Sequence, residues 1–326
     1  MTEPVVVSAP SRLHFGLLRF AQSHGPSFGG LGMMIAAPRA IVELAAADCW
    51  SAEGPSADRA LALARRALES TDAATKLAAL RVVVRSVVPP HRGLGGGTQL
   101  ALAVAAGVRR ALDLPAGTAE ELATAVGRGE RSAVGSHGFV HGGLVWETGR
   151  WPGEPLGRLA SRVALPVAWR VVLVAPRDVH GLSGKPEREA FEALPAVPEA
   201  TAARLQQLAE GQILPAAERG AVDDFGEGVF EYGRLAGNCF APVQGGPYSS
   251  AEIAGVVTAI RALGMCGVGQ SSWGPTVFAI VDGESRAREL ATELRARPQW
   301  SGYDFTIVAP DNRGATVSPA FRTAPR

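Results

Sequence analysis

Four short stretches of the sequence mix glycine with serine, histidine and arginine, a combination typical of loops that bind a charged ligand. A chain without Cβ atoms brings its backbone N–H groups close to an anion, and arginine and serine side chains add further donors. The four stretches are SAPSRLHFGLL at 8–18, HRGLGGGTQLALA at 91–103, GRGERSAVGSHGFVHGG at 127–143 and CGVGQSSWGPT at 266–276. We take them as the candidate parts of a ligand site.

The first stretch places Arg12 and His14 two positions apart, so their side chains project from the same face of a strand. A guanidinium holds a carboxylate or a phosphate by a two-point contact, and an imidazole transfers protons near neutral pH. We predict catalytic or substrate-binding roles for both residues. A hydrogen-bonded structural histidine is the alternative.

The second stretch joins a β-branched run, RVVVRSVV, to a helix-like segment. Backbone N–H groups and the positive end of a helix dipole bind phosphate at such a junction. The predicted phosphate cradle consists of Gly93, Gly95, Gly96, Gly97 and Thr98. The alternative is a tight strand-to-helix connection that uses glycine only for close packing.

The third stretch concentrates charged, hydroxyl and imidazole side chains among six glycines. We predict that Arg131, Ser132, His137 and His141 belong to the catalytic site. The two histidines have the spacing of a zinc pair on a helix, but the glycines around them predict that no helix forms there. An anion-contacting or hydrogen-bonding role is therefore favoured over zinc, and the ligands of any metal stay unknown.

The fourth stretch is a turn rich in glycine and serine that precedes an apolar strand. Its N–H and hydroxyl groups predict a second phosphate site, formed by Gly269, Gln270, Ser271, Ser272 and Gly274. Two glycine-rich turns together with arginines indicate a ligand with more than one phosphate. The usual nucleotide signatures, GxxxxGK[ST] and a GxGxxG after the first strand, are absent from the sequence.

Composition excludes several classes of protein. The chain has 32 Lys and Arg residues against 31 Asp and Glu residues, which removes the positive field of a nucleic-acid-binding protein. No apolar run is long enough for a membrane span, and the N-terminus lacks a signal-peptide pattern. The three cysteines are far apart and predict neither disulfides nor a zinc site. We expect a cytoplasmic enzyme or binding protein.

The elements that position these stretches are predicted from periodicity and from turn residues. At 326 residues, two domains are expected, 1–160 and 161–326, with a Pro- and Gly-rich break at 151–157. The second domain shows the strand and helix order of a split βαβ layer, although 212–249 is hard to assign. Strands are predicted at 5–8, 13–18, 40–50, 81–88, 142–148, 169–176, 276–281 and 303–308, and helices at 58–70, 98–112, 118–127, 250–263 and 284–297, with further helical segments within 186–236.

The arrangement of motifs resembles the GHMP kinase superfamily. An N-terminal strand motif, a PxxxGLGxxx loop before a long helix and a late glycine-rich turn correspond to Ser11–Leu17, Pro89–Thr98 and Gly267–Thr276. The resemblance implies an α+β fold, with a GHMP-type N-terminal domain like domain 2 of ribosomal protein S5 and a ferredoxin-like C-terminal domain. In this superfamily the glycine loop cradles phosphates.

Two departures from the kinase pattern are visible. Kinases of this type carry GLGSSAA where this chain has GLGGGTQ, and an aspartate base, as in GVD, where this chain has GERSAVG. Because phosphoryl transfer depends on positioning and on charge stabilisation, both departures disfavour an ATP-dependent kinase. That activity is kept as the alternative, and a non-catalytic binding protein of the same fold is a third hypothesis.

The chain more closely resembles the β-ribofuranosylaminobenzene 5'-phosphate synthase family, a non-kinase branch of the superfamily. The motifs are PSRLHFGL, GLGGGTQLALA, GRGERSAVGSHGFVHGG, GLSG at 181–184 and GQSSWGPT at 269–276. The resemblance implies a homodimeric enzyme that condenses phosphoribosyl pyrophosphate with 4-aminobenzoate or 4-hydroxybenzoate. Pyrophosphate and CO2 leave, and the C-riboside product leads to methanopterin-type one-carbon carriers.

Roles follow from that resemblance. The glycine cradle would take pyrophosphate with Mg²⁺ carried on the substrate phosphates, and 269–274 would take the ribose 5-phosphate. Arg12 or Arg131 would hold the benzoate carboxylate. Candidates for the ring slot are Phe15, Phe139 and Trp273, and candidates for proton transfer are His14, His137 and His141.

Overall fold

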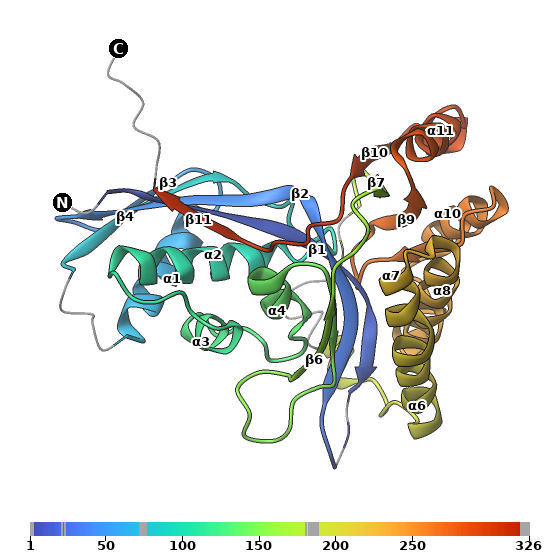
Figure 1. Cartoon of the computed structure of the whole chain (residues 1–326), viewed down its shortest axis with the longest axis horizontal. Coiled ribbons are helices and arrows are strands. Elements are labelled where there is room, and N and C mark those ends of the chain that lie inside the picture. The colour runs from blue at the N-terminus through green and yellow to red at the C-terminus, as the bar shows by residue number, and fades with distance from the viewer. Residues whose placement is uncertain are drawn as a thin grey trace.

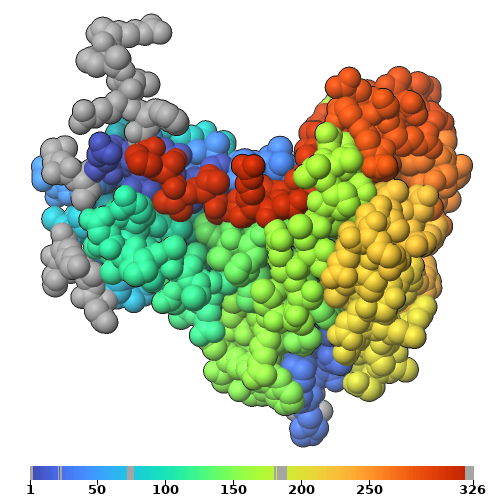
Figure 2. All heavy atoms as spheres, in the orientation of Figure 1, coloured from blue at the N-terminus to red at the C-terminus, as the bar shows by residue number. Residues whose placement is uncertain are grey.

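The computed structural model describes residues 3–20, 22, 24–71, 77–179, 181 and 189–319. The GLSG motif therefore lies almost wholly outside the described residues. Two sheets, of seven and four strands, organise the fold. In Figure 2 the blue to green part of the chain and the yellow to orange part form two lobes, and the red C-terminal segment lies along the first of them.

The first sheet is built on two long antiparallel strands, β1 (Val5–Arg19) and β2 (Phe28–Ala47). Pro10 does not divide β1 as predicted, because the register shifts between Ala9 and Ser11 and this bulge accommodates a residue without an N–H. The sheet order is β11-β1-β2-β4-β3, and β5 joins β2 to β6. The remaining bounds are β3 Ser51–Glu53, β4 Ala79–Ser86, β5 Leu144–Glu147, β6 Leu159–Val163 and β11 Thr316–Pro319.

Four helices accompany this sheet, and α2 packs directly on β1 and β2 (Figure 1). Helix α2 is apolar and almost entirely buried, so it forms the centre of this core. Helix α3 (Ala119–Ala125) begins with a capping box: Thr118 Oγ1 accepts from the Glu121 N–H at 3.1 Å, and Glu121 Oε2 accepts from the Thr118 N–H at 2.8 Å. The helices are α1 Ala57–Glu69, α2 Gly96–Ala111, α3 Ala119–Ala125 and α4 Val134–His141.

Helix α4 corrects the prediction that no helix forms in the third stretch. Its glycines serve close packing, because a Cβ atom on Gly138 would collide with the side chain of Met34 on β2. A Cβ atom on Gly135 would lie 3.5 Å from Thr98 and Gln99 of α2. Tertiary contacts thus override the low helix propensity of glycine.

The second sheet has the order β10-β7-β9-β8, with chain order β7, helices, β8, β9, α11, β10. This is the ferredoxin-like βαββαβ arrangement that the resemblance implied. Strand β8 lies within the stretch predicted as a turn. The bounds are β7 Trp169–Pro176, β8 Gly267–Gln270, β9 Val277–Asp282, β10 Tyr303–Val308, α6 Glu199–Leu208, η2 Ala209–Ile213, α7 Leu214–Arg219, α8 Val222–Asn238, α9 Ala241–Gln244, α10 Ala251–Ala262, α11 Glu284–Arg295 and η3 Pro298–Trp300.

The two lobes share one hydrophobic core that continues from α2 and the first sheet to Phe225 and Tyr232 of α8. Helix α8 lies against β1 (Figure 1). Beyond β10 the chain crosses back, and β11 pairs with β1. A boundary near residue 160 stays a prediction. None of the helices within the described ranges is long and apolar enough to cross a bilayer.

Candidate active site

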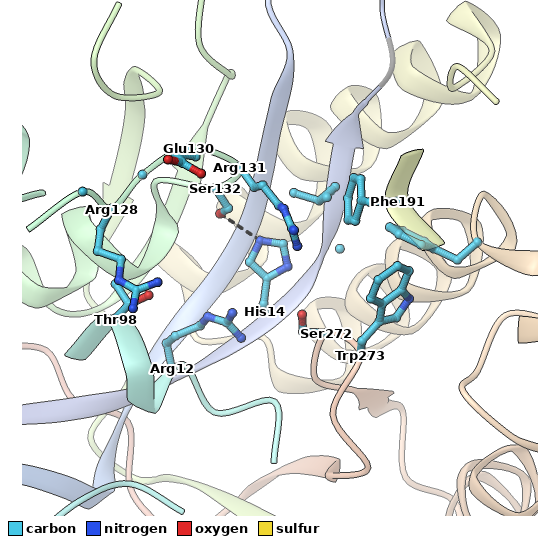
Figure 3. Close-up of a pocket in the computed structure, with 15 residues that line it drawn as sticks. Arg12, His14, Thr98, Arg128, Glu130, Arg131, Ser132, Phe191, Ser272 and Trp273 are labelled. Carbon is cyan, nitrogen blue, oxygen red and sulfur yellow. Dashed lines mark hydrogen bonds between the residues drawn. The ribbon is translucent and has the colours of Figure 1, made fainter. Parts of the chain in front are cut away.

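A cavity of about 440 Å³ lies where the two lobes meet and takes side chains from all four glycine-rich stretches (Figure 3). Such a position, between two domains, is common for small-molecule sites. Its lining residues are Arg12, His14, Gly16, Leu17, Thr98, Gly127, Arg128, Gly129, Glu130, Arg131, Ser132, Phe191, Phe240, Ser272 and Trp273.

Strand β1 brings both Arg12 and His14 to the cavity. The His14 ring is buried, and its Nε2 lies 3.0 Å from the Ser132 hydroxyl (Figure 3). Burial and the positive charge of Arg12 lower the pKa of His14 well below its usual range, so the imidazole is neutral at pH 7. Arg12 donates from Nη1 to the Gly93 carbonyl at 2.8 Å, which ties β1 to the glycine loop.

Of the third stretch, residues 127–132 line the cavity, and residues 133–143 do not. Arg131 and Ser132 line the space. His137 is buried elsewhere, with Nε2 2.8 Å from the Gly157 carbonyl oxygen, and burial lowers its pKa. His141 is exposed at the end of α4. The structure therefore brings one of the three candidate proton carriers, His14, to the cavity.

The glycines of the predicted phosphate cradle pack against other parts of the protein. Of the five residues predicted for the cradle, Thr98 lines the cavity. Gly95 precedes α2 with φ 74°, and Gly93 has φ 78°, both in the left-handed region that favours glycine. A Cβ atom on Gly96 would lie 2.8 Å from Val88 Cβ, and one on Gly97 would lie 2.8 Å from Arg59 Nη2. Close packing accounts for these glycines, while the N-terminus of α2 still faces the cavity through Thr98.

The late turn is locked to β1 and to the glycine loop by Ser271. This serine is fully buried; its hydroxyl donates to the Gly93 carbonyl at 2.7 Å and accepts from the His14 N–H at 3.0 Å. Gly269 and Gln270 belong to β8, and the Gln270 amide donates to the carbonyls of Ser272 and Gly274. Of the five predicted residues, the exposed Ser272, with φ 56°, lines the cavity.

Aromatic side chains form one wall of the cavity. Phe240 and Phe191 pack against Trp273 with ring centroids 5.0 and 5.3 Å apart, and the Arg131 guanidinium lies 4.7 Å from the Phe191 ring centre. Trp273 is thus placed where a ring could bind. Phe15 and Phe139 lie in the hydrophobic core and do not line the cavity.

Three arginines gather near the opposite end, where Arg128 lines the cavity and Arg59 and Arg66 lie beside it. The sequence analysis assigned no individual role to any of them. Arg59 Nη2 donates to the Gly97 carbonyl at 3.2 Å, and Gly127 lets Arg66 pack against its backbone beside Arg128. Burial, with the positive charges of Arg59 and Arg66, lowers the pKa of Arg128. Within the described ranges none of the three pairs with a carboxylate at ion-pair distance, and Arg128 Nε is buried without a partner. Such a cluster fits an anion.

Glu147 is a second group that the sequence did not single out. It ends β5 fully buried, and its Oε1 and Oε2 accept from the N–H groups of Ala133 and Gly149 at 3.0 and 3.1 Å. Burial outweighs these donors and raises the pKa of Glu147 to about 7.

Replacing Glu147 by Gln is expected to change how stability depends on pH. Because the pKa rises from 4.5 in the unfolded chain to about 7 in the fold, the folded state holds the proton more tightly. The free energy of unfolding is therefore about 3 kcal/mol larger below pH 4.5 than at high pH, and this difference is lost as the pH rises through 7. The free energy of unfolding, measured by urea titration across this range, should fall in the wild type relative to Glu147→Gln. Glu53→Gln, at an exposed position, is the control; parallel curves for Glu147→Gln and the wild type would contradict the assignment.

The described side chains offer no ready metal centre: nowhere in those ranges do three His, Cys, Asp or Glu residues gather closely enough to ligate an ion. Glu130 supplies the carboxylate of the cavity lining, with the hydroxyls of Thr98, Ser132 and Ser272.

Family models match both halves of the chain. The model for the GHMP kinases N terminal domain matches residues 59–143, and the model for the GHMP kinases C terminal region matches residues 213–298. Together they cover more than half of the sequence. The predicted α+β, two-domain fold is confirmed by these matches.

Curated relatives carry one name. The β-ribofuranosylphenol 5'-phosphate synthase of Methanothermobacter thermautotrophicus is 29% identical to this chain, over 86% of this chain and 90% of the relative. The protein of the same name from Archaeoglobus fulgidus is also 29% identical, over 94% and 97% of the two chains. The resemblance to this branch of the superfamily, predicted from five motifs, is confirmed.

Solved structures share the fold at low sequence identity. A putative homoserine kinase from Listeria monocytogenes superposes with a TM-score of 0.68 at 18% identity, covering 96% of this chain and 99% of that one. Mevalonate pyrophosphate decarboxylase from Streptococcus pyogenes gives a TM-score of 0.68 at 13% identity, covering 95% and 98%. These similarities concern architecture alone.

Proposed function

Because the chain belongs to the GHMP kinase superfamily, in the branch of its curated relatives, we propose that it condenses phosphoribosyl pyrophosphate with a 4-substituted benzoate. The products are a C-riboside 5'-phosphate, CO2 and pyrophosphate, in the synthesis of methanopterin-type one-carbon carriers. The observation that carries the proposal is a cavity with Arg128 at one end, beside Arg59 and Arg66, and an aromatic wall at the other. These two ends suit one polyanionic and one aromatic substrate.

The arginine-rich end is the proposed pyrophosphate site. Arg59, Arg66 and Arg128 supply positive charge beside the N-terminus of α2, whose first N–H groups lack helical partners. Stabilising negative charge on the departing pyrophosphate lowers the barrier to breaking the ribose C1–O bond. Ser272 lines the cavity and is the proposed contact for the ribose 5-phosphate.

The aromatic wall is the proposed arene site. A benzoate ring would stack beside Phe191 and Trp273, with its carboxylate toward the guanidinium of Arg131. The relatives' name contains phenol, so 4-hydroxybenzoate is the first arene to test, followed by 4-aminobenzoate.

Mg²⁺ fits this cavity as a companion of the substrate phosphates. One carboxylate, Glu130, together with the Thr98 hydroxyl matches the one or two protein ligands that Mg²⁺ takes when phosphates supply the rest. When bound there, the ion would neutralise charge on the phosphate oxygens.

The proposed reaction breaks and forms bonds between the two substrates and needs one side chain that can hold a proton. Pyrophosphate leaves with the C1–O electron pair, and the ring carbon that carries the carboxylate attacks C1 to form the C–C bond. The bond from that ring carbon to the carboxylate breaks, CO2 leaves, and the electron pair restores the aromatic ring. His14, neutral and on the cavity wall, takes the proton of the para hydroxyl during attack and returns it afterwards.

A direct assay tests the proposal. Purified protein is incubated with phosphoribosyl pyrophosphate, Mg²⁺ and each benzoate labelled in its carboxylate, and released CO2 is counted. We expect CO2 in equal amount to pyrophosphate, and no ADP when ATP and small alcohols are supplied instead. Alcohol-dependent ADP formation without CO2 release would favour the kinase alternative.

Arg128→Gln is expected to weaken pyrophosphate binding by roughly 10- to 100-fold, because a charge-assisted hydrogen bond of about 1.5 to 3 kcal/mol is lost. Isothermal calorimetry with Mg²⁺-pyrophosphate measures the affinity. Arg288→Gln, on the distant helix α11, is the matched control and should bind as the wild type does. Equal affinity in the two variants would move pyrophosphate away from the arginine-rich end.

A further inference from the structure

We propose that Ser271 is a positioning residue: its hydroxyl closes the free edge of β1 at His14 and fixes where the side chains of Arg12 and His14 lie in the cavity. The hydrogen bonds that carry this assignment do not depend on the reaction. The expected effect on turnover rests on the proposed function.

The edge of β1 that faces away from β2 is held by two loops at the residues that line the cavity. Strand β2 pairs along the other edge. The Arg12 N–H donates to the Leu94 carbonyl at 3.1 Å. The His14 N–H donates to Ser271 Oγ at 3.0 Å, and the His14 carbonyl accepts from the Ser272 N–H at 3.1 Å. Both main-chain hydrogen-bonding groups of His14 are therefore held by the late turn of the second lobe.

The partners of Ser271 set the direction of its hydrogen bonds. A backbone N–H can only donate, so the hydroxyl oxygen accepts from His14. A backbone carbonyl can only accept, so the single hydroxyl proton goes to Gly93, at 2.7 Å. The side chain is fully buried and has no proton left for a substrate oxygen. This geometry favours a positioning role over the predicted phosphate contact.

The Gly93 carbonyl connects this hydroxyl to the second cavity side chain of β1. It accepts the Ser271 proton and also a proton from Arg12 Nη1, at 2.8 Å. Gly93 has no room to move toward the late turn, because a Cβ atom on it would lie 2.1 Å from the Ser271 carbonyl oxygen. The main chain of His14 and the guanidinium of Arg12 are thus tied to one point.

A bulge in β1 explains why His14 needs an anchor on its free edge. The register of β1 against β2 shifts between His14 and Gly16. A bulge bends the strand and re-aims its side chains, so pairing with β2 alone defines the direction of the imidazole poorly. In Figure 3 Arg12 and His14 project into the cavity from β1, and Ser272 of the late turn lies beside them.

NMR of protein labelled with nitrogen-15 histidine tests the positioning without substrate. Each of the six histidines contributes one backbone amide signal, and His14→Gln identifies the signal of His14. In Ser271→Ala the His14 N–H loses its acceptor, so we expect its proton signal to move upfield. An unchanged His14 signal in folded Ser271→Ala would overturn the proposal, whatever reaction the protein catalyses.

Ser136→Ala is the matched control, because Ser136 is also fully buried and its hydroxyl has no hydrogen-bond partner among the described residues. The His14 signal should stay in place in this variant. Ser271→Cys covers the case in which Ser271→Ala does not fold, since a thiol is a weaker donor and acceptor than a hydroxyl. Its His14 signal should also move upfield, and an unchanged signal would equally overturn the proposal.

Kinetics separate positioning from phosphate binding. If the wild type releases CO2, turnover of Ser271→Ala should fall by roughly 10- to 100-fold, because a small displacement of reacting groups has an effect of this size. The KM for the arene and the calorimetric affinity for ribose 5-phosphate should change little, and Ser136→Ala should keep full turnover. Normal turnover in Ser271→Ala, or a loss confined to ribose 5-phosphate binding, would overturn the proposal. Absence of CO2 release by the wild type would refute the proposed function instead, and the His14 signal would then decide the positioning.

Discussion

Gly274→Ala should lower CO2 release by about 100-fold or more and destabilise the fold by about 3 kcal/mol. The added methyl group would collide with the backbone of Gly93 and Arg92, which cannot move aside as a flexible side chain does. The late turn must then separate from the glycine loop and carry Ser272 and Trp273 away from the cavity. Thermal unfolding and the CO2 assay measure the two effects.

Gly255→Ala is the matched control, because this glycine lies exposed in helix α10 with open space around it. Alanine there should stabilise the protein by up to about 1 kcal/mol and leave activity unchanged. If Gly274→Ala behaved like Gly255→Ala, the contact between the two glycine-rich loops would have no part in forming the site.

His14→Gln should reduce kcat by about 10² to 10⁴-fold while the affinity for the arene changes little. A glutamine amide can still form a hydrogen bond with Ser132, in the place of the ring nitrogen, but it offers no base to the cavity. The loss should therefore appear in turnover, as for a group whose interaction is made mainly in the transition state.

His24→Gln, at an exposed position before β2, is the control for replacing a histidine and should retain full turnover. Steady-state kinetics and arene titration by calorimetry separate the two effects for each variant. A His14→Gln enzyme with normal kcat, or one that loses only arene affinity, would show that His14 does not handle the proton.

Much of the fold could be predicted because apolar runs and periodicity mark it. The strands 169–176 and 303–308 are confirmed to the residue, since both are bounded by polar or turn positions. Helix α4 could not be predicted, because its glycines are explained only by Met34 and α2, far away in the sequence. Likewise β8 reads as a turn until its partner β9 is known.

Part of the site could also be predicted from the sequence. The cavity is lined by six of the residues predicted for the site: Arg12, His14, Thr98, Arg131, Ser132 and Ser272. The sequence analysis assigned no role to Arg59, Arg66 or Glu147. The fold brings them beside residues that are distant in the sequence: Arg59 and Arg66 lie near Arg128, and Glu147 accepts from the Ala133 N–H.

Strand β11 has a consequence for the order in which the molecule can be assembled. All strands of the second sheet lie between β6 and β11 in the sequence. Strand β11 can therefore pair with β1 only after the whole second sheet has been synthesised. The ferredoxin-like unit is thus an insertion between strands of the first sheet, and β11, which completes that sheet, is synthesised after all of it. A ribosome-bound chain that ends before Thr316 exposes the open edge of β1, with unpaired N–H and C=O groups that another chain could join.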